Sequence, residues 1–140
     1  EEMIDCARLA PSANNRQPWS FVVVRDEETL ERLGDICTYG SFIADCSACI
    51  VVLGDPEEKY FLEDGCAATE NILLAAKAMG YGGCWVAGHG KDYADRVLET
   101  LKAEGKELVS LLPLGEPLKE PERKGKKDVE EVMYLENMEG

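Results

Sequence analysis

Apolar and polar residues follow one another along the chain in blocks that are typical of an α+β protein. Runs of β-branched and aromatic residues predict strands at 19–24, 49–53 and 108–114, with a shorter extended piece at 82–86. Apolar positions spaced three and four apart, with acidic residues in the first turn, predict helices between these runs. We expect these helices at 26–37, 63–79 and 92–103.

The helix predicted at 63–79 is apolar nearly all round its middle. Acidic Glu63 and Asp64 stand at its N-terminus, Lys77 lies near its C-terminus and Gly80 follows, as helix ends favour. A helix of this kind is buried on most sides, in a core or in a subunit interface. Because a chain of 140 residues has little room to enclose it, the pattern favours a dimer.

The two ends of the chain differ from the middle. Residues 1–9 have the pattern of the last turns of a helix, so we expect a native N-terminal segment before them. From 118 onward the composition becomes polar, with a Pro and a Gly within 120–128, yet the end is apolar again. We therefore expect one domain over 1–140 whose C-terminal arm, 118–140, has one helical turn near 128–133 and wraps another subunit.

Charge and length exclude several classes of protein. With 15 Lys and Arg against 28 Asp and Glu, the net charge is −13, which argues against unspecific binding to nucleic acid or to anionic lipid. The apolar runs are far shorter than the roughly 20 residues of a membrane span, and no signal peptide is visible. A hydrophobic share of 45% indicates a folded domain and not a disordered chain.

Six cysteines and no export signal are consistent with a cytoplasmic protein. Cys46 and Cys49 form a CxxC, which could be a zinc half-site or a pair of small buried thiols at the start of a strand. A second ligand pair is absent from the sequence, and His89 is its only histidine. We therefore favour buried, reduced, metal-free thiols.

Three segments could carry chemistry, and each also has a purely structural interpretation. The loop 11–19 concentrates hydroxyl, amide and guanidinium groups that could recognise a ring or a phosphate, or could cap their own backbone. The glycine-rich stretch 80–90 permits close backbone approach, or is a tight turn beside a core Trp85. The basic cluster 123–127 is a binding group or a solvated tail. We interpret His89 as a solvent-facing turn residue and name no catalytic acid or base.

Taken together, these segments resemble the nitroreductase family of FMN enzymes. The resemblance is carried by 8–24, which contains Pro-Ser-Ala-Asn-Asn-Arg-Gln-Pro-Trp, and by 64–80 running into Gly-Cys-Trp-Val at 83–86. It continues through Leu-Leu-Pro-Leu-Gly-Glu-Pro at 111–117 to Arg123, Lys124 and the stretch 129–132. The blocks occur in the family's order along almost the whole chain.

The resemblance implies a three-layer α-β-α sandwich with a mostly antiparallel sheet, assembled as an intertwined homodimer with FMN at the interface. It implies that the long helix packs on its mate, that the arm adds an edge strand to the partner, and that a backbone N–H near Ala87 faces flavin N5. The cofactor-binding residues that it implies are Pro11, Ser12, Ala13, Asn15 and Gln17 from one subunit, Cys84, Trp85, Val86, Ala87 and Gly88 from the other, and Arg123 with Lys124 near the pyrimidine or phosphate.

The resemblance further implies an oxidoreductase that passes hydride from NAD(P)H through the flavin to a small acceptor, such as a nitroaromatic or quinone, with ping-pong kinetics. Alternatives are a dehalogenase or flavin-cleaving enzyme of the same fold, or a flavin-binding dimer without turnover. The family's Arg-x-Ser-x-Arg motif should lie well before Pro11, where only ten residues are present, which is a second reason to expect a preceding segment. The short connection 54–62 implies an active site that is open, or that is covered differently from the site of larger members.

Overall fold

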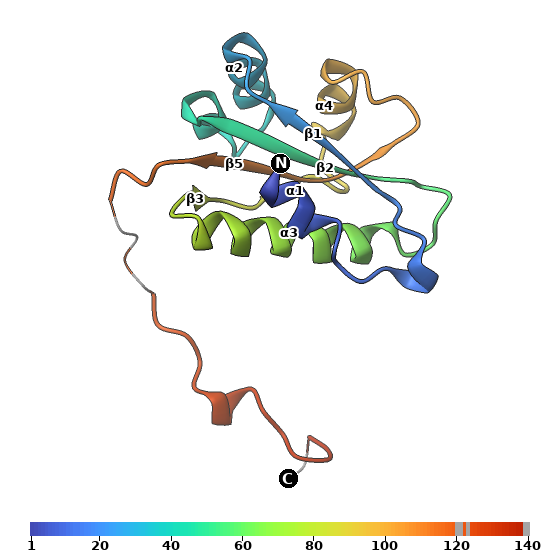
Figure 1. Cartoon of the computed structure of the whole chain (residues 1–140), viewed down its shortest axis with the longest axis vertical. Helices are drawn as coiled ribbons and strands as arrows, with labels where there is room; N and C mark the ends of the chain where they lie inside the picture. Colours follow the sequence, from blue (N-terminus) through green and yellow to red (C-terminus); the bar gives the residue numbers. More distant parts are fainter. Residues whose placement is uncertain (120–121, 123, 139–140) are drawn as a thin grey trace.

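The computed structural model describes residues 1–119, 122 and 124–138, and its centre is an antiparallel sheet (Figure 1). The sheet has five strands in the order β1-β2-β5-β3, and β4 also pairs with β5. The strands are β1 Trp19–Val24, β2 Ala48–Gly54, β3 Gly82–Gly83, β4 Val86–Ala87 and β5 Glu107–Gly115. The predicted strands are confirmed, and the extended piece at 82–86 is two short strands.

Helices cover both faces of this sheet. The α-helices are α1 Glu2–Ala7, α2 Glu27–Ile36, α3 Phe61–Ala78 and α4 Ala94–Thr100, with 3-10 turns η1 Ala13–Asn15, η2 Ser41–Asp45 and η3 Val129–Glu131. Figure 1 shows α2 and α4 on one face and α1 and α3 on the other, which confirms the three-layer sandwich. The Asp26 carboxylate caps α2 by accepting the Thr29 backbone N–H at 3.0 Å. The Thr29 hydroxyl, which donates to the same oxygen at 2.7 Å, and this backbone N–H together lower the pKa of Asp26.

The sheet separates two apolar cores. Leu33, Ile43 and Leu111 are fully buried on the side of α2 and α4, whereas Ile72 and Leu112 are fully buried on the side of α3. The central strands β2 and β5 are buried along nearly their whole length. This explains why their sequences are continuously apolar and do not alternate, because both faces of each strand are covered.

A β-bulge interrupts the pairing of the two central strands. Val52 pairs with Ser110, but the next residue, Leu53, pairs with Leu108, so Val109 is an extra residue in β5. The bulge turns the side chains of Val109 and Ser110 to the side of α3, where Ser110 Oγ lies 2.8 Å from Thr69 Oγ1. Both hydroxyls are fully buried. Bulges often re-aim residues beside functional sites, and this one lies at the candidate site described below.

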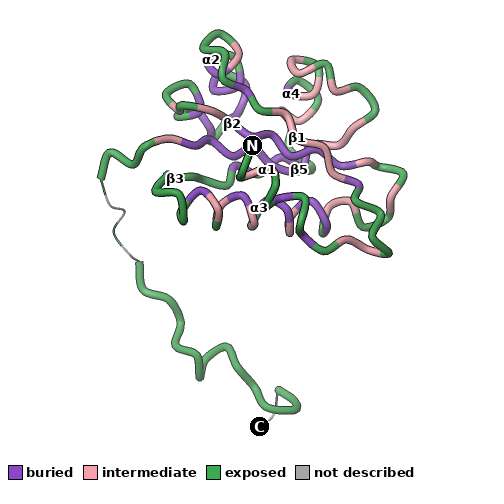
Figure 2. Tube along the Cα trace, viewed as in Figure 1, coloured by how far each residue is buried: buried purple, intermediate pink, exposed green. Residues whose placement is uncertain are grey.

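Much apolar surface is uncovered in the single chain (Figure 2). Leu74 of α3 is 60% exposed, and Met79, directly after the helix, is 44% exposed. The helix is therefore covered on one side only, and in this chain it is not buried all round. Every described residue after Gly115 is exposed, and Figure 1 shows this arm leading away from the domain. Among the described residues, no helix is long and apolar enough to cross a membrane.

Candidate functional site

The loop 11–17 joins α1 to β1 in an unusual backbone conformation. Three loop residues have positive φ values: 51° at Asn14, 56° at Asn15 and 51° at Gln17. These values lie in the left-handed region of backbone conformation, which residues other than glycine seldom occupy. Ser12 Oγ accepts the Gln17 backbone N–H at 3.0 Å, and Gln17 Nε2 donates to the Asn15 carbonyl at 3.2 Å. Side chains of the loop thus cap part of its own backbone, as the purely structural interpretation of this segment predicted.

A second set of contacts joins this loop to the start of α3. The Ala13 N–H donates to both carboxylate oxygens of Asp64, each at 3.2 Å. Asp64 is 8% exposed and stands in the first turn of α3, where the helix dipole stabilises an anion. The loop and the helix form an open pocket of about 350 Å³, lined by Pro11, Ser12, Ala13, Tyr60, Glu63, Asp64 and Ala67.

A larger hollow, of about 580 Å³, opens elsewhere, beside the first residues of the chain. Its lining includes Ile4, Met79 and Tyr81 but none of the residues implied to bind the cofactor. We therefore assign the candidate site to the smaller pocket, because only that pocket contains implied residues.

The segment 84–88 runs along β5. The N–H and carbonyl groups of every second residue pair with β5, and those of the residues between them point away from it. Cys84 N–H donates to the Pro113 carbonyl at 3.3 Å and Gly88 N–H to the Val109 carbonyl at 3.1 Å. In an antiparallel ladder the intervening odd-numbered residues face the other way, so the Ala87 N–H and carbonyl point away from β5. The Tyr93 hydroxyl donates to that carbonyl. The Ala87 N–H therefore points away from β5, to a side where a ligand atom could accept its hydrogen bond.

The first turn of α3 lies between these two segments. Asp64 contacts the loop 11–17, while the Phe61 ring meets His89 edge-to-face with 5.6 Å between ring centroids. His89 Nδ1 also lies 3.9 Å from Glu107 Oε2, and the imidazole is 42% exposed. His89 is thus a half-exposed turn residue beside a carboxylate, which agrees with the interpretation from sequence.

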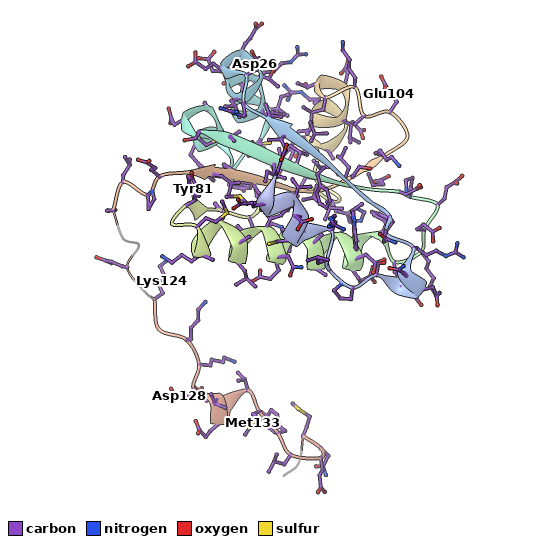
Figure 3. The ribbon with its side chains drawn as sticks, in the orientation of Figure 1. Asp26, Tyr81, Glu104, Lys124, Asp128 and Met133 are labelled. Carbon is purple, nitrogen blue, oxygen red and sulfur yellow. The ribbon has the colours of Figure 1, made fainter. Side chains whose placement is uncertain are left out.

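The structure places the implied site residues in several environments. The pocket contains Pro11, Ser12 and Ala13, and the remaining loop residues, Asn15 and Gln17, are exposed. Cys84, Trp85 and Ala87 are exposed, whereas Val86 and Gly88 are buried, and the N–H and carbonyl of Gly88 already pair with Val109 and Lys91. Lys124 lies on the arm, away from the domain in Figure 3, and Arg123 is outside the described residues. Within one chain, therefore, the arm does not meet the pocket.

Sequence reasoning missed two residues that shape these segments. Asp64 was interpreted only as a favourable charge at a helix N-terminus, and Tyr93 only as part of a surface helix. Tyr93 is instead 4% exposed and precedes α4, which begins two residues later than predicted. No local signal in the sequence points to the Ala13–Asp64 contact, because the two residues are 51 positions apart. The Tyr93–Ala87 contact spans six positions and depends on how the turn between them folds.

The CxxC belongs to the core and not to this site. Cys49 is fully buried, and burial raises the pKa of its thiol to about 12. The Cys46 thiol is half-buried and donates to the Ala48 carbonyl at 3.1 Å. Across the described part of the chain, no group of three or more His, Cys, Asp or Glu residues is arranged to hold a metal ion.

The pocket suits the ring end of a flavin better than its phosphate end. Its lining includes the acidic Glu63 and Asp64, and it contains no basic side chain among the described residues. Carboxylates repel a phosphate, whereas a neutral ring can stack on Pro11 and accept hydrogen bonds from backbone N–H groups. The residues present therefore fit the ring of FMN, and the phosphate requires a cation from elsewhere.

Comparison with known proteins agrees with the fold and the loop signature. The model of the nitroreductase family matches residues 1–40 and 37–116. A protein of Archaeoglobus fulgidus with the provisional name NADH dehydrogenase/NAD(P)H nitroreductase is 40% identical over 124 residues, which cover 84% of this chain and 71% of that protein. The chain belongs to the nitroreductase family, so the resemblance found in the sequence is confirmed.

Solved structures support the same family and fold. An FMN-dependent nitroreductase of Clostridium difficile superposes with a TM-score of 0.86 at 28% identity, covering 97% of this chain and 85% of that one. A Bacteroides thetaiotaomicron protein with the same provisional name as the archaeal relative superposes with a TM-score of 0.87 at 30% identity. That match covers 95% of this chain and 81% of the other.

Proposed function

We propose that this chain is an FMN-dependent NAD(P)H oxidoreductase that reduces a small oxidised acceptor, such as a nitroaromatic or a quinone. FMN as the cofactor follows from family membership and from the name of the Clostridium relative, and NAD(P)H as the donor follows from the name of the archaeal relative. One observation carries the proposal: the family's loop 11–17 is fixed over the first turn of α3 and forms a pocket there.

Bound FMN would supply hydride transfer between NAD(P)H and the acceptor, so donor and acceptor would use the site in turn. The chain's own residues position the ring. Pro11, Ser12 and Ala13 line one side, and the Ala87 N–H is a preorganised donor, because Tyr93 holds the carbonyl of the same residue.

The enzyme is a homodimer in this proposal, with each site built from both subunits. Leu74 and Met79 expose apolar surface on α3, and the arm exposes Val132, Met133 and Leu135. Large apolar side chains that are exposed in one chain support an interface that would cover them. An arm that crosses to a partner also brings Arg123 and Lys124 toward the phosphate end of the cofactor, where the pocket itself offers no described cation.

Titration with FMN followed by anaerobic addition of NAD(P)H tests the proposal. We expect saturable FMN binding and bleaching of the flavin bands, with recovery of the bands when a quinone is added. FMN binding without bleaching by either nucleotide would leave a flavin carrier, and no binding would contradict the proposal altogether.

A pair of matched variants tests the role of the arm. Arg123→Ala removes a charged hydrogen bond and should weaken FMN binding about ten- to a hundredfold. Lys126→Ala removes the same charge three residues further along and should change binding little. Equal effects of the two variants would show that the cluster acts only as a solvated tail.

A further inference from the structure

The strained loop 11–17 is held from outside by one buried carboxylate. Its backbone passes through three left-handed residues, Asn14, Asn15 and Gln17, and each such residue costs of order 1 kcal/mol or more. A conformation of this kind persists only where its surroundings determine it. The loop's internal contacts, Ser12 Oγ with Gln17 N–H and Gln17 Nε2 with the Asn15 carbonyl, join loop residues to each other and not to the domain.

The contacts that join the loop to the rest of the domain are unequal. At its end, the Pro18 carbonyl accepts the Asp55 N–H at 2.9 Å, which fixes the entry into β1. Arg16 Nε lies 3.9 Å from Glu58 Oε2, but the Arg16 side chain is 62% exposed and that of Glu58 is 38% exposed, and long pairs open to solvent contribute little. The Ala13–Asp64 contact is different, because it lies at the centre of the loop and its acceptor is a charged group that is 8% exposed.

The position of Asp64 explains why a carboxylate can serve in this place. It stands in the first turn of the 18-residue helix α3, so the N-terminal end of the helix dipole stabilises its charge. Both of its oxygens share the single Ala13 N–H at 3.2 Å, a symmetric contact that holds the η1 turn against the helix. The neighbouring Glu63 lines the same pocket but is exposed to solvent.

We propose that Asp64 is a positioning residue that holds the loop 11–17 in its ligand-ready conformation and thereby sets the affinity for the flavin ring. The proposal rests on the proposed function, since it takes the loop as the flavin-binding element. Asp64 itself need not touch the cofactor. If the loop is ready only part of the time, the apparent dissociation constant rises in inverse proportion to that fraction.

The tether can be tested without any cofactor, by amide hydrogen exchange measured residue by residue with NMR. The N–H groups of Ala13, Asn15, Arg16 and Gln17 all have acceptors in the closed loop. We expect Asp64→Ala to speed the exchange of all four together by about ten- to a hundredfold, the range of one hydrogen bond to a charged group. Asp64→Asn keeps one acceptor oxygen and should restore part of the protection.

The control is Glu63→Gln, which removes a charge from the same helix turn and the same pocket. It should leave the exchange of the four amides unchanged. Faster exchange at Ala13 alone, or equal effects of Glu63→Gln and Asp64→Asn, would overturn the proposal, because the carboxylate would then not control the loop as a unit.

Flavin binding supplies the second readout. The dissociation constant of FMN should rise in the order wild type, Asp64→Asn, Asp64→Ala, in step with loop opening. Loop opening in Asp64→Ala with unchanged FMN affinity would refute the link to the cofactor. Failure of the wild-type protein to bind FMN would instead refute the proposed function, and the exchange experiment would still report on the tether.

Discussion

Gly88→Ala is the substitution whose effect the structure defines most sharply. A Cβ atom at this position would lie 2.5 Å from Leu108 Cγ and 3.0 Å from the backbone carbon of Val109. The backbone of Gly88 is outside the left-handed region, so glycine is needed here for space and not for conformation. The β-bulge causes this crowding. The carbonyl oxygen of the extra residue, Val109, accepts hydrogen bonds from the N–H groups of both Gly88 and His89, at 3.1 and 3.3 Å, which draws the two backbones together.

The expected loss of stability follows from how much closer than ordinary contact the new methyl group would lie to Leu108. Ordinary contact begins at 3.4 Å, so the new methyl is 0.9 Å too close to a side chain that is itself fully buried. Overpacking of this kind costs about 1–3 kcal/mol, and we expect the upper half of that range because the second neighbour is backbone. For a domain of this size, about 2–3 kcal/mol corresponds to a fall in Tm of roughly 5–10 °C.

The assay compares Gly88→Ala with Gly82→Ala by thermal and urea unfolding. Gly82 also lies in a strand that pairs with β5, but a Cβ there would have its nearest neighbours at 3.6 Å. Gly82→Ala should therefore change the free energy of unfolding by less than about 0.5 kcal/mol. Introducing Leu108→Ala should reduce the cost of Gly88→Ala, because the closest atom is then absent. Equal Tm values for the two glycine variants would refute the reasoning, since packing at the bulge would then not exclude a methyl group.

Other predictions concern the interface, the core and the thiols. Leu74→Glu places a charge on the exposed face of α3 and should raise the dissociation constant of the dimer at least about a hundredfold; sedimentation velocity showing an unchanged dimer would contradict that interface. Thr69→Val leaves the buried Ser110 hydroxyl without its 2.8 Å partner and should cost about 1–3 kcal/mol in urea unfolding, whereas adding Ser110→Ala should cost less than the sum of the two single effects. The folded-state pKa of Cys49 is raised to about 12 from its ordinary 9.0, so the native state retains a proton that the unfolded state loses, and stability should fall as pH rises above 9. Cys49→Ala should make that fall shallower, and an identical pH profile for both proteins would show that this thiol does not contribute.

Several elements could be predicted from sequence because their signals are local. Strand β1 and the cap of α2 depend on residues within a few positions of each other, such as Asp26 and Thr29. The continuous apolar runs predicted strands at β2 and β5, and the structure shows why the runs do not alternate, because both strands are buried along nearly their whole length. The helix α3 was predicted to within two residues, although its outer face is exposed in the single chain.

The candidate site was predictable only in part. The loop 11–17 and the stretch 84–88 could be chosen from their composition and their family resemblance, but their surroundings could not. Val86 lies in the core with its side chain turned from any ligand, and the contact between Ala13 and Asp64 joins distant parts of the chain. No local pattern encodes such a contact, because it depends on how α3 crosses the sheet.

The sequence alone determined the order and type of the elements, the family and the segments that carry its signature, since these follow from local periodicity and from residue types that recur in a set order. Only the tertiary structure decided which carboxylate holds the loop, where the bulge in β5 requires a glycine at 88, and which face of α3 is left uncovered. The physical reason is the same in each case. Packing and hydrogen bonding act between groups that the fold brings within a few ångströms, whatever their separation along the chain.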